Sequence, residues 1–206
     1  GKMGNVSIGG DFASGTGADS ATIASGGAIG AMTIGGDLVG GAQDNGTQRL
    51  LGAATTSTMP FGGDGGQVQI DPTNSNYIYG EYVWTQVHRS TNGGGSSNFI
   101  TGNISETTAA TANFITPLLL DPTSALRLYA GASSLWRTTN ARASSVTWSV
   151  VKPATTSKIS ALAISPSNGN VMWVAHNDGR IYRSANATAA TPTWVPVDDN
   201  AGLDPM

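Results

Sequence analysis

Two glycine-rich segments carry the carboxylates best suited to chemistry in this chain. Gln43-Asp44-Asn45-Gly46 and Gly62-Gly63-Asp64-Gly65-Gly66 each hold an aspartate among residues that favour sharp bends. Inverting glycoside hydrolysis uses two carboxyl groups about 6.5–9.5 Å apart, one as acid and one as base. If the chain is an enzyme, Asp44 and Asp64 are the pair that we predict to be catalytic. The glycines around Asp64 would also let the backbone approach a ligand or an ion closely.

A second group of polar and aromatic side chains falls in segments 80–84 and 176–179. Trp84, which we expect in a loop, suggests a stacking platform for a ligand or a lid on a sheet edge. Rings gathered with carboxylates and amides suit a sugar site. The alternative for Asp44 and Asp178 is ordinary turn chemistry, because Asp-Asn-Gly and Asn-Asp-Gly favour tight turns. The predicted ligand-binding residues are Gln43, Asp44, Asn45, Asp64, Glu81, Tyr82, Trp84, His176, Asn177 and Asp178.

The composition argues against several other kinds of site. The 206 residues include no cysteine, which removes disulfides, thiolate metal sites and cysteine nucleophiles. Ten Lys and Arg against thirteen Asp and Glu leave a net charge of −3, so we expect no nucleic-acid partner. His88 and His176 show no metal-ligand spacing, and no apolar run reaches the roughly 18 residues of a membrane span. We predict no cofactor, with Ca²⁺ at Asp44 or Asp64 as an alternative that has no loop signature behind it.

The elements that must position these residues are set by a repeat of 44 to 50 residues. One anchor is Asp71-Pro72, Asp121-Pro122 and Ser165-Pro166, separated by 50 and 44 residues. A second anchor is an aromatic residue or histidine followed by Arg and Ser or Thr, with its arginines 48 and 46 residues apart. Those arginines are Arg89, Arg137 and Arg183. Three copies that keep two anchors in a fixed order indicate a repeated structural unit.

Each unit contains four short segments with the alternation of β-strands, which we name A to D in chain order. Strand A precedes the Asp/Ser-Pro turn, strand B follows it, strand C carries the arginine anchor, and strand D holds a late tryptophan. Four antiparallel strands in every 40 to 50 residues are typical of a β-propeller blade. The predicted fold class is therefore all-β, with an incomplete propeller over residues 41–206. We expect a partial blade near 41–66 and full blades near 67–115, 116–157 and 158–198.

The anchor and its following turn resemble the Asp-box, or bacterial neuraminidase repeat, a β-hairpin with the pattern Ser-x-Asp-x-Gly-x-Thr-Trp. Segment 89–96 keeps that pattern with Asn92 in the acidic position, while Trp148 and Trp194 match the closing tryptophan. Asn140 and Asn186 stand where Asn92 does, so the acidic consensus is absent from all three copies. The resemblance covers about residues 40–197 and implies a propeller like those of sialidases, xyloglucanases and sortilin-type receptors.

Strand order then sorts the motifs onto two faces. In an up-and-down meander, the B–C and D–A loops share one face, and the A–B and C–D loops share the other. The Asp-Pro turns and Asp-box turns fall on the second face, where we expect their Asn and Ser side chains to satisfy turn amides. We expect the tryptophans to pack between blades. The candidate site residues fall on the first face.

A different repeat precedes the propeller. Residues 4–15 return as residues 30–41 with an offset of 26 residues, keeping an Ile-Gly-Gly-Asp core. Short alternating strands bounded by paired glycines suit a rung of a β-solenoid, and a glycine-rich linker is the alternative. The segment resembles the glycine-rich β-strand repeats of bacterial surface proteins. We therefore divide the chain into residues 1–40 and 41–206.

These patterns predict a non-catalytic binding or scaffold module of a secreted or cell-surface bacterial protein, directed at carbohydrate. A sialidase site would need three arginines, a tyrosine nucleophile and acidic partners, and Arg89, Arg137 and Arg183 already belong to the repeat. A glycoside hydrolase of the sialidase or xyloglucanase type is the first alternative, and a receptor-like, protein-binding propeller is the second. Three and a half blades do not close a ring. We expect the remaining blades to come from the rest of a longer chain or from another subunit.

Overall fold

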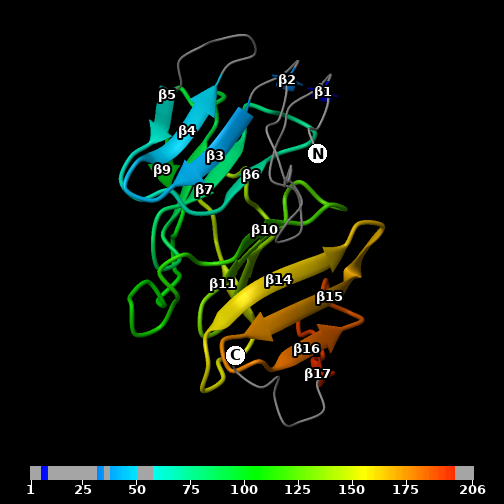
Figure 1. Ribbon diagram of the computed structural model, residues 1–206. Helices are drawn as coiled ribbons and strands as arrows, with labels where there is room; N and C mark the ends of the chain where they lie inside the picture. The colour runs from blue at the N-terminus through cyan, green and yellow to red at the C-terminus, as the bar shows by residue number, and fades with distance from the viewer. Residues whose placement is uncertain (1–5, 9–31, 35–37, 51–57, 198–206) are drawn as a thin grey trace, which may run out of the picture.

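The computed structural model describes residues 6–8, 32–34, 38–50 and 58–197, and within these ranges every regular element is a β-strand (Figure 1). Nothing in this part of the chain is a helix that could cross a membrane. The strands from residue 38 onward form four antiparallel sheets in which each strand pairs with the next in sequence. This is the meander that the repeat predicts, and the all-β class is confirmed.

We call the four sheets blades 1 to 4. Blade 1 contains β3 (Leu38–Ala42), β4 (Gly46–Leu50) and β5 (Thr58–Phe61). Blade 2 contains β6 (Val68–Ile70), β7 (Ile78–Glu81), β8 (Val87–Ser90) and β9 (Asn98–Phe99). Blade 3 contains β10 (Leu118–Leu120), β11 (Leu128–Gly131), β12 (Leu135–Thr138) and β13 (Ser149–Lys152). Blade 4 contains β14 (Ile159–Ser165), β15 (Asn168–His176), β16 (Ile181–Ser184) and β17 (Val195–Pro196).

The hydrophobic core is divided among the interfaces between neighbouring blades. Strand β10 shows how: Leu118 and Leu120 belong to a cluster shared with blade 2, while Leu119 belongs to a cluster shared with blade 4. Successive side chains of a strand point to opposite faces of its sheet. An unbroken Leu-Leu-Leu run therefore fits a blade that is covered on both sides. A third cluster, which includes Val39 and Ile78, joins blades 1 and 2.

The late tryptophans pack between blades, as predicted. The indole of Trp148 in blade 3 donates a hydrogen bond of 2.8 Å to the carbonyl of Ile100 at the end of blade 2. The indole of Trp194 in blade 4 makes the same bond, also 2.8 Å, to the carbonyl of Val151 in blade 3. Each tryptophan thus ties its own blade to the one before it.

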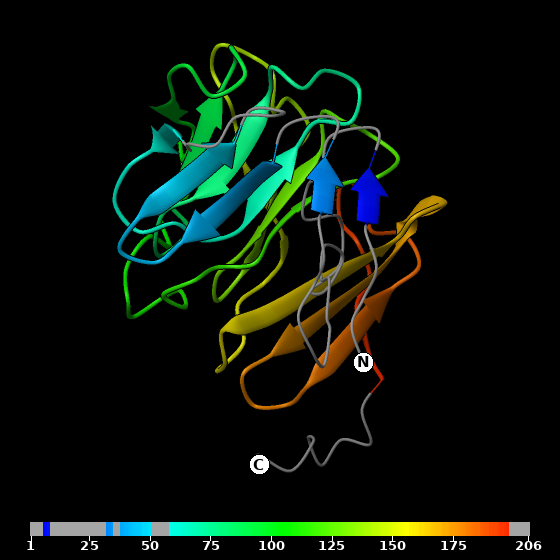
Figure 2. The same ribbon diagram turned by 45° about the horizontal axis from the view of Figure 1, so that its top comes forward.

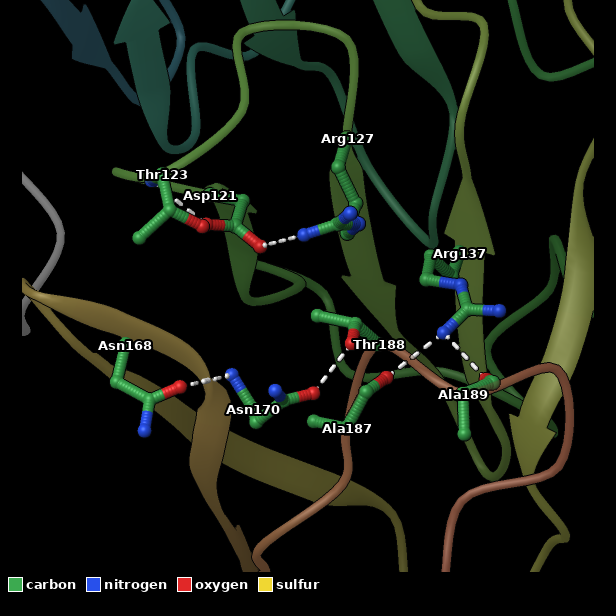
Figure 3. A network of polar contacts seen from close by, with 9 residues as sticks. All are labelled: Asp121, Thr123, Arg127, Arg137, Asn168, Asn170, Ala187, Thr188 and Ala189. Atoms are coloured by element: carbon green, nitrogen blue, oxygen red, sulfur yellow. Dashed lines mark hydrogen bonds and ion pairs between the residues drawn. The ribbon is translucent and has the colours of Figure 1, made fainter.

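The anchor arginines tie each blade to the one after it, a role that the sequence did not reveal. Arg137 in blade 3 donates from Nη1 to the carbonyls of Ala187 and Ala189 in blade 4, at 2.7 and 2.9 Å (Figure 3). Arg89 in blade 2 makes the equivalent pair of bonds to two carbonyls of blade 3, both at 2.7 Å. Arg49 occupies the same place in blade 1, opposite Val39, and its side chain packs against Gly94 in the hairpin of blade 2. Arg49 therefore also belongs to the repeat.

The asparagines that follow the anchor arginines satisfy turn amides, which confirms their predicted structural role. The side-chain oxygens of Asn92, Asn140 and Asn186 accept hydrogen bonds of 2.8–3.0 Å from main-chain amides four to seven residues later. A neutral amide oxygen performs this task as well as a carboxylate oxygen, since only an acceptor is needed. The Asp-Pro turn works similarly, because Asp71 accepts from the amides of Thr73 and Asn74.

The N-terminal repeat forms a parallel pair of strands. Strands β1 (Val6–Ile8) and β2 (Met32–Ile34) pair in parallel with Val6 opposite Met32 and Ile8 opposite Ile34 (Figure 2). This register reproduces the 26-residue offset of the sequence repeat, as stacked rungs of a β-solenoid would. The residues between the two strands lie outside the described part of the chain.

Candidate binding face

The B–C and D–A loops meet on one face, and main-chain hydrogen bonds join them at all four blades. The β3–β4 turn accepts from the loop before β6, through Gly65 N–H to the Ala42 carbonyl at 3.1 Å. The loops after β7 and β11 both bond to the long loop 100–117. Blade 4 repeats the pattern with a bond of 2.9 Å from Asn177 N–H to the Lys158 carbonyl. This face carries the predicted site residues.

Asp44 and Asp64 lie close together, and their contact is a hydrogen bond that stabilises the β3–β4 turn. The carboxylate of Asp64 accepts a hydrogen bond of 2.9 Å from the main-chain amide of Asp44. Asp44 has a φ of 63°, in the left-handed region that Asp and Asn tolerate in turns. Asp64 therefore holds the β3–β4 turn in place, and the exposed carboxylate of Asp44 stays available to solvent.

The glycines around Asp64 serve the packing of one backbone on another. A Cβ on Gly65 would lie 2.2 Å from the carbonyl oxygen of Gly46, which no side chain could tolerate. Gly63 has a φ of 81°, and the ring of Tyr82 fills the space that its Cβ would need. The predicted close approach of this loop is thus made to the neighbouring turn and to Tyr82. Gln43 and Asn45 are exposed in that turn.

Glu81 was expected in the B–C loop, and the structure places it instead at the end of β7 with only 1% of its surface exposed. Its carboxyl group lies against Gly66, and neither carboxyl oxygen has a hydrogen-bond partner among the described residues. Burial raises the pKa of Glu81 from 4.5 to about 8, because the charged form loses its hydration. Glu81 is therefore mainly a neutral acid at pH 7.

An aromatic pair on this face joins Trp84, which stands on a strained loop, to Phe114 on the loop 100–117. Trp84 and Thr85 have φ values of 51° and 62°, and Asp44 is the other described non-glycine residue with positive φ. All three stand in B–C loops of this face, where such strain commonly accompanies function. The ring of Trp84 meets Phe114 edge to face, with centroids 6.1 Å apart, and Phe114 is 40% exposed.

Loop 100–117 extends this aromatic pair into a polar patch toward blade 4. Asn113, next to Phe114, exchanges two side-chain hydrogen bonds with Asn177, at 3.0 and 2.8 Å. Asp178 follows in an exposed turn, 3.6 Å from Arg180. The structure thus brings Trp84 and Asn177 to one continuous patch through two residues, Asn113 and Phe114, that sequence reasoning missed. Their only signal was an Asn-Phe pair inside an expected loop.

His176 was also predicted to bind ligand, but it is the last residue of β15 and only 3% exposed. Its Nδ1 lies 2.8 Å from the carbonyl of Ser157, and its Nε2 lies 3.0 Å from the Nζ of Lys152. Because an ammonium group only donates, Nε2 accepts and Nδ1 carries the proton. Burial lowers the pKa of His176, and it lowers the pKa of Lys152 from 10.5 to about 8. The pair is a buried structural contact.

Replacing Lys152 by methionine is expected to raise the free energy of unfolding at pH 7 by about 1–3 kcal/mol. Methionine keeps an apolar stem and removes a charge that burial disfavours. A lysine with a lowered folded-state pKa destabilises the protein fully below that pKa, so wild-type stability should rise as pH increases from 8 to 10.5. Urea denaturation across this window should show that rise in the wild type and lose it in the variant.

Lys158→Met is the matched control for this measurement, because Lys158 is only half-buried and its Nζ bonds to the Ala109 carbonyl. We expect Lys158→Met to retain the wild-type pH dependence. If Lys152→Met is less stable than the wild type at pH 7, the contacts of the Lys152 Nζ with His176 and with the Tyr182 ring, 4.0 Å from the ring centroid, outweigh its burial.

Metal ligands do not assemble in the described ranges, where no three His, Asp or Glu side chains come together as a candidate metal site. A Ca²⁺ ion at Asp44 or Asp64 stays a prediction.

Comparison with proteins of known structure identifies the fold. No family model matches the sequence, and no curated protein does. Among solved structures, the GH74 enzyme of Niastella koreensis matches with a TM-score of 0.60 and 18% identity over 79% of this chain and 28% of its own. An ancestral GH74 enzyme matches at 0.58 and 16% identity over 78% of this chain and 22% of its own. The GH74 xyloglucanase of Xanthomonas campestris matches at 0.56 and 15% identity, over 82% and 30%.

The fold is that of a β-propeller. The β-propeller domain of Cps50 (Swd1) matches as well, with a TM-score of 0.50. The described blades are thus an incomplete propeller, and this chain spans only 22 to 30% of the length of the GH74 chains. At these identities the likeness concerns the fold alone.

Proposed function

We propose that this propeller segment binds carbohydrate through the patch formed by Trp84, Phe114, Asn113 and Asn177, and does not itself hydrolyse it. The observation that carries the proposal is the Trp84–Phe114 pair, an aromatic surface beside the side-chain amides of Asn113 and Asn177, with Trp84 on a loop of positive φ. Rings stack on the apolar faces of sugars, and amides donate to and accept from hydroxyl groups. The fold shared with a GH74 xyloglucanase makes a β-glucan chain the first ligand class to test.

A non-catalytic role is supported by how the carboxylates are used. Asp64 already accepts the Asp44 amide, and Glu81 is buried against Gly66. Neither arrangement offers two accessible carboxyl groups on opposite sides of a glycosidic bond. We further propose that the protein acts outside the cell or at the cell surface of a bacterium, where polysaccharide ligands are found.

Trp84→Ala is expected to weaken binding of xyloglucan oligosaccharides at least tenfold, which corresponds to loss of about 1.4 kcal/mol. Titration calorimetry and affinity electrophoresis against xyloglucan, with unrelated polysaccharides alongside, provide the measurement. Phe99→Ala is the control, because Phe99 is an exposed ring on β9, the outer strand of blade 2. Binding that survives both Trp84→Ala and Phe114→Ala would remove the patch from the proposal, and affinity for peptides alone would favour a protein-binding propeller.

A glycoside hydrolase is the second candidate, favoured by one observation. Burial raises the pKa of Glu81 to about 8, with a smaller contribution from the nearby Asp64, and a buried acid of raised pKa beside a second carboxyl group suits acid–base chemistry. Release of reducing ends from xyloglucan, abolished by Asp64→Asn in a folded variant, would replace the binding proposal. We expect no such turnover.

A further inference from the structure

The outer face of blade 4 is equivalent to the faces of blades 2 and 3 that the following blade covers. Strand pairing places Tyr79 opposite Arg89 in blade 2, Tyr129 opposite Arg137 in blade 3, and Trp173 opposite Arg183 in blade 4. These three pairs are therefore equivalent positions of successive blades. The two tyrosines are 0% exposed, because the next blade covers them, whereas Trp173 is 37% exposed.

The same contrast holds along the whole face. Four residues of blade 3 face blade 4, and each is at most 4% exposed: Leu119, Tyr129, Leu135 and Val151. Their equivalents in blade 4 are exposed or half-buried, namely Ala163, Trp173, Ile181 and Val197. Alanine replaces leucine where tryptophan replaces tyrosine, so the blade 4 surface stays apolar and its largest side chain is Trp173.

The hydrogen-bonding groups of the interface are present as well. Arg89 and Arg137 each donate to two carbonyls of the following blade. Arg183 has the same position, and its described contact is with the ring of Trp173, 5.7 Å from the guanidinium carbon to the ring centroid. The carbonyls of Ile100 and Val151 accept the indole of the following blade, and Val197 stands at the equivalent position.

A groove of about 310 Å³ lies on this face, lined by Arg183, Ala185, Asn186, Thr193, Val195 and Val197. One blade earlier, the equivalent surface is covered by the blade 4 hairpin, whose Trp194 reaches Val151 and whose carbonyls reach Arg137. The groove therefore has the position and the polar groups that a tryptophan-bearing hairpin needs for binding.

We propose that this face is the docking surface for a fifth blade of the same repeat, which follows blade 4 as blade 4 follows blade 3. The hairpin of that blade presents two carbonyls, two residues apart, to Arg183, and its closing tryptophan donates to the carbonyl of Val197. Its inner strands cover Trp173. The occupant is inferred from the two complete interfaces of this chain, which use the same groups in the same places.

The experiment compares the 206-residue chain with an extended chain in which residues 152–197 are repeated directly after Val197. That repeated unit carries the groups that blade 4 already offers to blade 3. In the extended chain, Arg183→Met should lower the unfolding midpoint by about 4 °C or more, as Arg137→Met should in both chains. In the 206-residue chain, Arg183→Met should change the midpoint by less than about 1 °C, as exposed substitutions usually do.

Quenching of Trp173 by acrylamide supplies a second readout, obtained as the difference between each chain and its Trp173→Phe variant. We expect Trp173 to be accessible in the 206-residue chain and at least threefold less accessible in the extended chain. Protection of Trp173 in the monomeric 206-residue chain would overturn the proposal, as would equal effects of Arg183→Met in both chains. Self-association of the 206-residue chain that Trp173→Ala abolishes would assign the face to a second copy and also overturn it.

Discussion

Replacing Trp148 by alanine is expected to lower the free energy of unfolding by about 3–5 kcal/mol, the usual cost of removing a buried indole. Trp148 is only 3% exposed and packs in the cluster shared by blades 2 and 3. The substitution opens a cavity between the two blades and leaves the Ile100 carbonyl without its 2.8 Å partner. Chemical denaturation, followed by circular dichroism, measures the change. Loss of the inter-blade contact should also broaden the transition if the blades then unfold separately.

Trp173→Ala is the matched control, since it removes the same side chain from the outer face of blade 4. Trp173 is 37% exposed, so its removal forfeits less burial and leaves no closed cavity. We expect a cost below about 1 kcal/mol in the 206-residue chain. Equal losses for the two variants would contradict the view that stability is concentrated between blades.

Glu81→Gln is expected to raise the free energy of unfolding at pH 8 by about 2–4 kcal/mol and to change it little near pH 4.5. The pKa of Glu81 is about 8 in the folded protein and near its ordinary 4.5 when the chain unfolds. Between these values the unfolded chain releases the proton and the folded chain keeps it. Wild-type stability therefore falls as pH rises from 4.5 to 8, and glutamine removes that fall.

Glu106 offers the opposite case in the same protein. Its carboxylate accepts three hydrogen bonds, from Ser134 N–H and Oγ at 2.8 and 2.9 Å and from the Trp136 indole at 3.1 Å. Glu106→Gln should lose stability by about 1–3 kcal/mol at pH 7, because a neutral amide oxygen replaces a carboxylate oxygen as the acceptor for the Ser134 amide and the Trp136 indole, and hydrogen bonds to a charged group are the stronger ones. Urea denaturation of both variants at several pH values separates the two roles. A Glu81→Gln variant less stable than the wild type at pH 8 would show that the ionised carboxylate is stabilised.

The repeat pattern was sufficient to predict blades because the relevant signals are local. Alternating apolar residues determine which segments pair as strands, and the anchors at Asp71 and Asn92 mark turns whose amides those side chains satisfy. The spacing of these signals along the chain then defines the repeated unit. Asparagine serves in these turns as well as aspartate would, since a turn amide needs only an acceptor.

The candidate site was predicted only in part, because burial depends on what lies beside a strand. The sequence predicted loop positions for Glu81 and His176, yet each is the last residue of a strand and is buried by neighbouring segments. Asp64 read as a ligand-binding or catalytic group, and its carboxylate bonds to the amide of Asp44, twenty residues away. Nothing in the local sequence records such a distant partner.

By itself, then, the sequence determined the all-β class, the order of strands and the structural role of the hairpin motifs, since each depends on residues close together in the chain. The tertiary structure alone decided that arginines of one blade bond to carbonyls of the next, about fifty residues away. It also decided that Asn113 and Phe114 complete the patch begun by Trp84 and Asn177. These contacts arise from the stacking of whole sheets, and a stacked sheet brings together side chains whose proximity no short-range pattern encodes.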